Sequence, residues 1–325
     1  QYTSKTDQAE EESQQPRICQ VIKFMDEHYE IRRNVVKEQI EFRKIIPDLP
    51  KTEQPPFSTL RTKDVNTFYI NAQMKKIYSS QANLKALVDS DYAKPFNPFV
   101  HYFTSLQTWD GKTDHIGQLT KTVKAADQAF FEDSFRRWLV GMVACAIDDE
   151  AQNHQLMLLH GAQGKGKSTF VRHLLPPELK DYYRNGMISP DNKDHLLQMS
   201  SCLLINLDEF DKYAPTKMPL LKNLMQMASL SLCKAYQKNY RSLPRIASFI
   251  GTSNRKDLLT DPTGSRRFIC VLVEYPIDCE GIDYAQLYAQ LKAEILTGEH
   301  YWFTKEEETE LQQSNMTFYR QGPVE

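Results

Sequence analysis

The octet Gly161-Ala162-Gln163-Gly164-Lys165-Gly166-Lys167-Ser168 matches the phosphate-binding pattern G-x-x-x-x-G-K-S/T without a gap. In this pattern glycines let backbone N–H groups curl around phosphates, the lysine reaches the β and γ oxygens, and the serine hydroxyl ligates Mg²⁺. The octet therefore predicts a site for a nucleoside triphosphate with Mg²⁺ as the metal. The residues expected to bind the nucleotide are Gly161, Gly164, Lys165, Gly166, Lys167, Ser168 and Thr169.

The residues on either side of the octet predict the right local structure for such a loop. HQLMLLH, residues 154–160, has the composition of a short buried strand that leads into the loop. TFVRHLL, residues 169–175, continues as a helix that Pro176 and Pro177 end. The amino end of that helix adds partial positive charge to the anion site.

Strands and helices alternate in the rest of this region, which predicts an α/β fold with a parallel sheet wrapped by helices on both faces. An amphipathic helix at 130–147 is expected to pack beside the sheet, because its apolar residues recur every three or four positions. Further strands are expected at 202–207, 246–251 and 268–273, and further helices at 191–199, 216–228 and 284–296.

Composition narrows the class of protein. The 325 residues, 41% of them hydrophobic, are enough to bury a core. Forty basic residues against 42 acidic ones give a net charge of −2, so any nucleic acid must be bound by a local patch. No apolar run approaches the ~20 residues of a membrane span. The six cysteines form no C-x-x-C pair, and a reduced, cytoplasmic setting is expected.

Four regions are expected along the chain. Residues 1–17 are a polar, disordered tail or linker, and residues 18–125 form a mixed, mainly helical region in which Arg32 and its basic neighbours alternate with glutamates as a salt-bridged strand face. Residues 126–300 form the nucleotide-binding domain. Residues 301–325 are expected to be a truncated C-terminal extension, since the chain starts at Gln1 rather than Met and ends abruptly at Glu325.

The acidic pair Asp208-Glu209 directly follows the predicted strand 202–207. An aspartate at that edge can enter the Mg²⁺ shell, and the adjacent glutamate can polarise a water for attack on the γ-phosphate. Together they predict hydrolysis rather than binding alone. Two solvated surface acids are the alternative. Asp211 is a third candidate.

Polar residues near the next two strands complete the expected catalytic set. Asn254 follows the strand 246–251 and can place an amide between water and the γ-phosphate. Arg266 and Arg267 precede the strand 268–273, and a guanidinium supplied from a neighbouring subunit can neutralise charge on the transferred phosphoryl group. A structural pair bridging to carboxylates is the alternative, and position does not rank the two arginines.

In combination these motifs resemble the virulence-associated protein E family. The resemblance rests on the glycine loop, Leu-Asp208-Glu209, FIGTSN at 249–254 and DPTGSRRF at 261–268, with WDG at 109–111 and RWLVG at 137–141, and it spans about residues 66–303. It implies a P-loop ATPase of the ASCE or AAA+ type, similar to superfamily 3 helicases, with ATP as the nucleotide. It also implies replication of phages or mobile elements and a homo-oligomeric ring. The site residues that it implies are Lys167, Ser168, Asp208, Glu209, Asn254, Arg266 and Arg267; no primase motif is visible.

Residues 232–245 interleave basic and aromatic side chains. In superfamily 3 helicases this interval carries a hairpin that tracks single-stranded DNA, and the residue types suit phosphate contact and base stacking. The DNA-binding candidates are Lys234, Lys238 and Arg241, although the family favours arginine at the place of Lys234. A solvated basic hairpin is the alternative.

Three functions fit these observations to different degrees. The leading hypothesis is an ATP-hydrolysing DNA helicase or translocase acting on single-stranded DNA. The second is an ATP-dependent regulatory switch or interaction protein that moves no DNA. A small-molecule kinase fits poorly, because Glu209 and the arginine pair belong to a water-activating design in which subunits are coupled.

Overall fold

The computed structural model describes residues 16–189, 191–213, 215–232, 241–259 and 265–319. The chain divides into two units, residues 1–98 and 99–325. The boundary of the nucleotide-binding domain expected at residue 125 stays a prediction. The two structural units divide earlier, at residue 98, because the helix at 115–121 packs on two helices of the second unit. The tail expected at 1–17 lies almost wholly outside the described residues.

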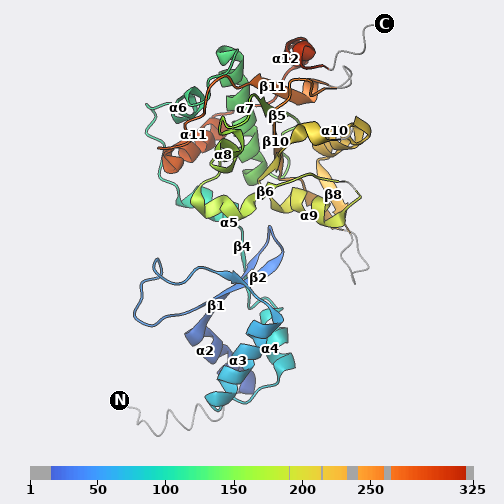
Figure 1. The fold of residues 1–325 in the computed structure, drawn as a ribbon. Helices are drawn as coiled ribbons and strands as arrows, with labels where there is room; N and C mark the ends of the chain where they lie inside the picture. The colour runs from blue at the N-terminus through green and yellow to red at the C-terminus, as the bar shows by residue number, and fades with distance from the viewer. Residues whose placement is uncertain (1–15, 190, 214, 233–240, 260–264, 320–325) are drawn as a thin grey trace. The chain divides into compact units, whose positions relative to one another are not determined.

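The first unit contains helices and a four-stranded sheet (Figure 1). Its sheet order is β3-β2-β1-β4, with β1 antiparallel to β2 and parallel to β4. Tyr29, Phe42 and Phe68 bring their rings together in a core between this sheet and the helices. The elements are α2 (Arg17–His28), β1 (Tyr29–Asn34), β2 (Gln39–Lys44), β3 (Ser58–Thr59), α3 (Thr62–Met74), α4 (Gln81–Val88) and β4 (Lys94–Phe96).

The charged face of β1 and β2 is salt-bridged, as the alternation of charges predicts. Arg32 lies opposite Glu41 in the strand register, and their side chains are 2.8 Å apart. Glu30 and Arg43 form the second directly opposed pair, at 2.6 Å. Opposite charges at such cross-strand positions stabilise a sheet. These basic residues are therefore engaged within the unit.

The second unit is built around five parallel strands in the order β11-β5-β10-β7-β6. Its elements are α5 (Pro98–Ser105), α6 (His115–Lys121), α7 (Gln128–Ile147), β5 (Leu156–His160), α8 (Lys167–Arg172), β6 (Tyr183–Asn185), α9 (Lys193–Ser201), β7 (Leu204–Leu207), α10 (Met218–Gln226), β8 (Ser229–Leu232), β9 (Arg241–Pro244), β10 (Ser248–Ser253), β11 (Phe268–Leu272), α11 (Tyr284–Leu296) and α12 (Lys305–Ser314).

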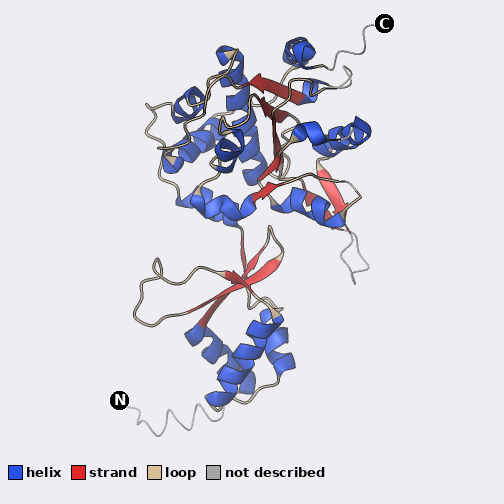
Figure 2. Ribbon diagram, in the orientation of Figure 1, coloured by secondary structure: helices blue, strands red, loops and turns tan. Residues whose placement is uncertain are grey.

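Helices cover both faces of this sheet (Figure 2), which confirms the α/β fold with a parallel, helix-flanked sheet. On one face Trp138 of α7 is buried and donates its indole N–H to the Phe249 carbonyl at 3.2 Å. On the other face α10 contributes Leu221 and Leu224 to the core cluster that contains Leu156. Parallel strands covered on both faces are apolar throughout, and four of the five strands were predicted on that basis.

The strand β6 was missed because its sequence gives no strand signal. It has three residues, Tyr183-Arg184-Asn185, at the edge of the sheet beside β7. Short polar edge strands are held by pairing with their neighbour rather than by their own composition. In the described residues, none of the helices is both long enough and apolar enough to cross a bilayer.

Candidate nucleotide site

The glycine loop leaves the carboxyl end of β5 with a backbone that side chains would obstruct. Gly161 has φ of 151°, and a Cβ there would lie 2.5 Å from the Val273 carbonyl oxygen. Gly164 and Gly166 have φ of 84° and 79°, in the left-handed region that glycine adopts at little cost. The strand, glycine loop and helix succession predicted from the sequence is present.

Lys167 is held at the centre of the loop. Its ammonium donates to the carbonyls of Gly161 and Ala162 at 2.7 and 2.9 Å and to Asn254 Oδ1 at 3.1 Å. The residue is 6% exposed. Burial lowers the pKa of Lys167, as does the neighbouring Lys165 charge, while Asp208 acts in the opposite direction. Lys167 and Asn254, predicted from separate motifs, therefore meet in the fold.

Three oxygen-bearing side chains meet beside this lysine. Ser168 Oγ donates to Asp208 Oδ1 at 2.9 Å, and the Thr252 hydroxyl donates to the same oxygen. Burial by itself would raise the pKa of Asp208, but the hydrogen bonds from Thr252, Ser168 and the Glu209 N–H outweigh it and hold that pKa below its ordinary value. An ionised carboxylate beside a hydroxyl is a donor set that fits Mg²⁺, which prefers oxygen ligands.

Glu209 lines the same site from a strained position. Its φ is 52°, in the left-handed region, which is uncommon for a residue with a side chain. Its side chain is 61% exposed, and its carboxylate accepts from the Lys212 ammonium at 2.6 Å. The glutamate is thus exposed to solvent at the edge of the site, with an exposed lysine as its partner.

These residues surround a pocket of about 300 Å³ at the carboxyl edge of the sheet. Its walls are the backbone of the loop, the acidic pair after β7 and the polar residues that end β10. All of the residues predicted to bind the nucleotide except Gly161 line it. The ammonium of Lys165 is engaged elsewhere, because it donates to the carbonyls of Val273 and Glu274 at 2.9 and 2.6 Å.

The two arginines lie at the other end of the sheet. They form a short turn with Ser265 directly before β11, and β11 runs parallel to β5 with Phe268 opposite Leu156. The loop follows the far end of β5, so a strand length of about 16 Å separates it from the arginines. Arg266 pairs with Glu308 at 3.0 Å, whereas Arg267 Nε is buried without a hydrogen-bond partner in the part of the chain that the structure describes.

The basic interval 232–245 belongs to a β-hairpin that begins at Ser229. Its strands β8 and β9 are antiparallel, with Leu232 opposite Arg241 next to the connecting residues and Ser229 opposite Pro244 at the base. Lys234 and Lys238 lie outside the described residues. Arg245, at the base, is 2% exposed and donates to the carbonyls of Met227, Ala247 and Asn153 at 2.7, 2.6 and 3.2 Å. That arginine holds the hairpin on the domain.

Replacing Arg245 by Met is expected to destabilise the protein by about 3 kcal/mol or more, because buried carbonyls that lose their donor cost about 1–3 kcal/mol each. Denaturant unfolding measures this. Arg255→Ala is the matched control, since Arg255 forms an exposed pair with Asp257 and should leave the unfolding midpoint almost unchanged. Equal midpoints for the two variants would contradict the structural role of Arg245.

Thr252, which lines the site, and His160, which ends the strand before the loop, were not among the predicted residues. Thr252 is the penultimate residue of β10, and its polar character at a strand end was the available signal. His160 ends β5, is 3% exposed, and stacks edge-on against Phe318 with ring centres 4.9 Å apart. Burial and then the Lys256, Lys167 and Lys165 charges lower the pKa of His160 to about 4, so its imidazole is neutral at physiological pH.

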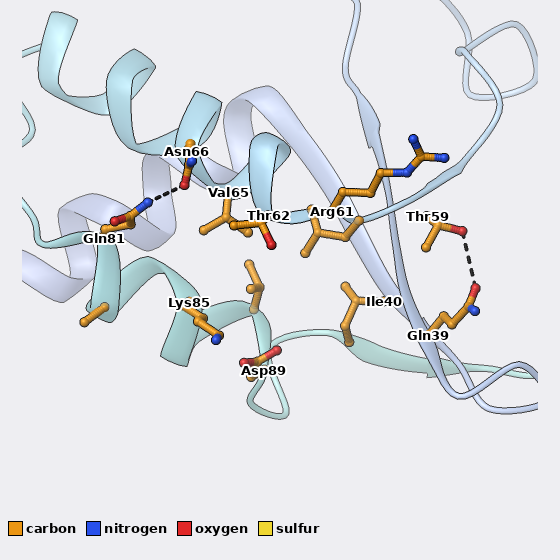
Figure 3. Close-up of a pocket in the computed structure, with 13 residues that line it drawn as sticks. Gln39, Ile40, Thr59, Arg61, Thr62, Val65, Asn66, Gln81, Lys85 and Asp89 are labelled. Carbon is orange, nitrogen blue, oxygen red and sulfur yellow. Dashed lines mark hydrogen bonds between the residues drawn. The ribbon is translucent and has the colours of Figure 1, made fainter. Parts of the chain in front are cut away.

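A larger cavity, about 620 Å³, lies in the first unit between β2, α3 and α4 (Figure 3). Gln81 and Asn66 bridge its helices by a hydrogen bond, and Thr59 donates to Gln39 across its strands at 3.3 Å. Asp89 is the single carboxylate in its lining. With no glycine loop and no paired acids, it lacks the groups that phosphate transfer needs, and the smaller pocket in the second unit has them.

Comparison with solved structures agrees with this fold. The structure titled "The apo structure of NrS-1 C terminal region (305-718)" matches with a TM-score of 0.52 at 12% identity, over 93% of this chain and 76% of that one. Two A form apo structures of the NrS-1 C-terminal region match at 12% and 13% identity, over 92% of this chain and 66% and 67% of theirs, with TM-scores of 0.45 and 0.47.

At 12–13% sequence identity a structural match shows similarity of fold alone, and the two matches with TM-scores below 0.5 carry no argument. No curated protein matches this chain. The family model of the virulence-associated protein E-like domain matches residues 103–320, two thirds of the sequence and nearly the whole second unit. The chain therefore belongs to the virulence-associated protein E-like family.

Proposed function

We propose that this protein is a P-loop ATPase of the ASCE or AAA+ type that uses Mg²⁺-dependent hydrolysis to act on single-stranded DNA in the replication of a phage or mobile element. The observation that carries the proposal is the meeting of Ser168, Asp208 and Thr252 beside the Lys167 and Asn254 pair in one pocket. Three separate segments of chain bring the groups that phosphate transfer requires to one place.

Each residue has a distinct task in this proposal. The loop N–H groups and Lys167 bind the phosphates, and Ser168 with Asp208 holds Mg²⁺. The metal, when bound, neutralises charge on the β- and γ-phosphoryl oxygens. Glu209 accepts a proton from the attacking water, and Asn254 orients that water and the γ-phosphate.

The arginine turn supports a ring of identical subunits in this proposal. Arg267 is too far from the loop of its own subunit to reach it, so its partner site would be in the next subunit. A sizing experiment with Mg²⁺ and a non-hydrolysable ATP analogue tests the ring. A monomer under those conditions would count against both the ring and the role of Arg267.

Adding single-stranded DNA is expected to raise the rate of ATP turnover several-fold, and the effect should weaken as salt is increased, because phosphate contacts release counterions. Phosphate release with and without DNA measures this. Changing both Lys238 and Arg241 to Ala should remove the stimulation and any unwinding while basal hydrolysis is retained. An ATP turnover rate that does not change when DNA is added would favour the ATP-dependent switch. Transfer of the phosphate to an acceptor molecule, rather than its release into solution, would favour a kinase.

A further inference from the structure

A second pocket of the second unit, about 170 Å³, lies between α6 and the residues that lead into α11. One face of α6 and its C-cap residue form a wall, with His115, Gln118 and Thr122 spaced three and four residues apart. Glu280 and Asp283 belong to the opposite wall. The volume corresponds to roughly six liquid waters, which is room for a planar heterocycle but not for a whole nucleotide.

Both walls are tied to the glycine loop through the backbone. Ile277 donates its N–H to the Lys165 carbonyl at 3.0 Å, and Glu280 follows three residues later. On the other wall, the Glu274 N–H donates to the Lys124 carbonyl at 2.8 Å, and the Glu274 carbonyl accepts from the Lys165 ammonium at 2.6 Å. Thr122, which lines the pocket, is two residues before Lys124. At 3.3–3.6 Å per residue the pocket begins within about 10 Å of the loop.

The pocket also lies on the side of the loop where a nucleoside would emerge. Asp208 and Asn254, which face the γ-phosphate in the proposed function, follow β7 and β10. Those strands lie on one side of β5, and β11 lies on the other. A triphosphate with its γ end at Asn254 therefore directs its nucleoside toward β11, and the segment after β11 forms the pocket.

The lining suits a neutral ring and not another phosphate. It contains the carboxylates of Glu280 and Asp283 but no lysine or arginine among its lining residues, all of which are described. His115 Nε2 is buried and has no hydrogen-bond partner among the described residues. Carboxylates accept from an exocyclic amine, and an imidazole or the Gln118 amide can pair with a ring nitrogen.

We propose that this pocket is the nucleobase subsite of the nucleotide held by the loop, and that it prefers a purine with an exocyclic amine, adenine. The proposal rests on the proposed function, since it assumes that the loop binds a triphosphate. Ile282 offers apolar contact with the ring, and the polar groups of the lining distinguish the base. The loop supplies affinity for phosphates and this slot supplies selectivity.

The test compares a non-hydrolysable ATP analogue with inorganic tripolyphosphate, which has the phosphates but no base, by titration calorimetry on the full chain with Mg²⁺. Gln118→Trp places a bulky ring in the slot from an exposed position of α6. We expect it to weaken analogue binding by roughly tenfold or more, the scale of lost base contacts, and to change tripolyphosphate binding less than twofold. Lys121→Trp, exposed on the same helix but outside the lining, should change neither.

A second variant tests the preference for the amine. The unmodified protein should bind ATP roughly tenfold more tightly than inosine triphosphate, and His115→Ala should reduce that ratio. Unchanged analogue binding in Gln118→Trp, or equal loss of both ligands in a folded Gln118→Trp protein, would overturn the subsite. An unmodified chain that binds neither analogue nor tripolyphosphate would instead overturn the proposed ATPase, so the two failures are distinguishable.

Discussion

Replacing Glu209 by Gln is expected to lower kcat for ATP hydrolysis by about 10²–10⁴-fold, the usual contribution of a positioned general base. The amide has nearly the same shape but cannot accept the proton of the attacking water. Glu209 lines the phosphate pocket without contacting Lys167 or Ser168 through any described bond, so nucleotide binding should be kept. A variant that binds but does not turn over is the expected phenotype.

Phosphate release gives kcat, and titration with a non-hydrolysable analogue gives affinity. Lys212→Ala is the matched control, because it removes the surface partner of Glu209 and leaves the carboxylate in place. We expect that control to retain hydrolysis. Turnover by Glu209→Gln within a few-fold of the unmodified protein would identify Glu209 as a solvated surface acid.

Arg267→Ala is expected to lower kcat still further, by about 10³–10⁵-fold, if its guanidinium completes the site of the next subunit. The reason for choosing Arg267 is its environment. Its Nε is buried and lacks a partner among the described residues, while Arg266 is engaged by Glu308 at 3.0 Å. Arg266→Ala, the control, should lose a half-exposed ion pair and little activity.

Mixing two inactive variants separates action in trans from action within one subunit. Glu209→Gln subunits keep Arg267, and Arg267→Ala subunits keep Glu209. In a randomly mixed ring about a quarter of the interfaces combine both intact residues, so activity should return on mixing. Activity that stays at the level of the separate variants would show that Arg267 does not complete a neighbouring site.

Much of the second unit could be predicted from sequence because its signals are local. Buried parallel strands are apolar along their whole length, and a phosphate loop needs glycines where φ is positive, as at Gly164 and Gly166. The same logic located Asp208 and Asn254, since strand ends in a parallel sheet share one edge. Apolar composition did not predict β6, because its three residues are held in the sheet by pairing with β7.

The roles of two charged residues became clear only from the tertiary structure. Arg245 belongs to the same basic interval as Arg241, but its guanidinium is buried among backbone carbonyls and serves the fold. Lys165 is one residue from Gly166 in a phosphate loop, yet its ammonium fastens the loop to the end of β11. A long side chain can reach in several directions, and its neighbours in space decide which.

The sequence by itself determined the strand, loop and helix around residues 161–168 and the order of polar groups after the strands, because apolar periodicity and glycine conformations act over a few residues. Tertiary structure alone decided that Ser168, Asp208 and Thr252 share one oxygen cluster, that Arg266 and Arg267 lie at the opposite edge of the sheet, and that α6 and the residues after β11 enclose a slot beside the loop. Those relations depend on strand order and packing, which join residues far apart in the chain.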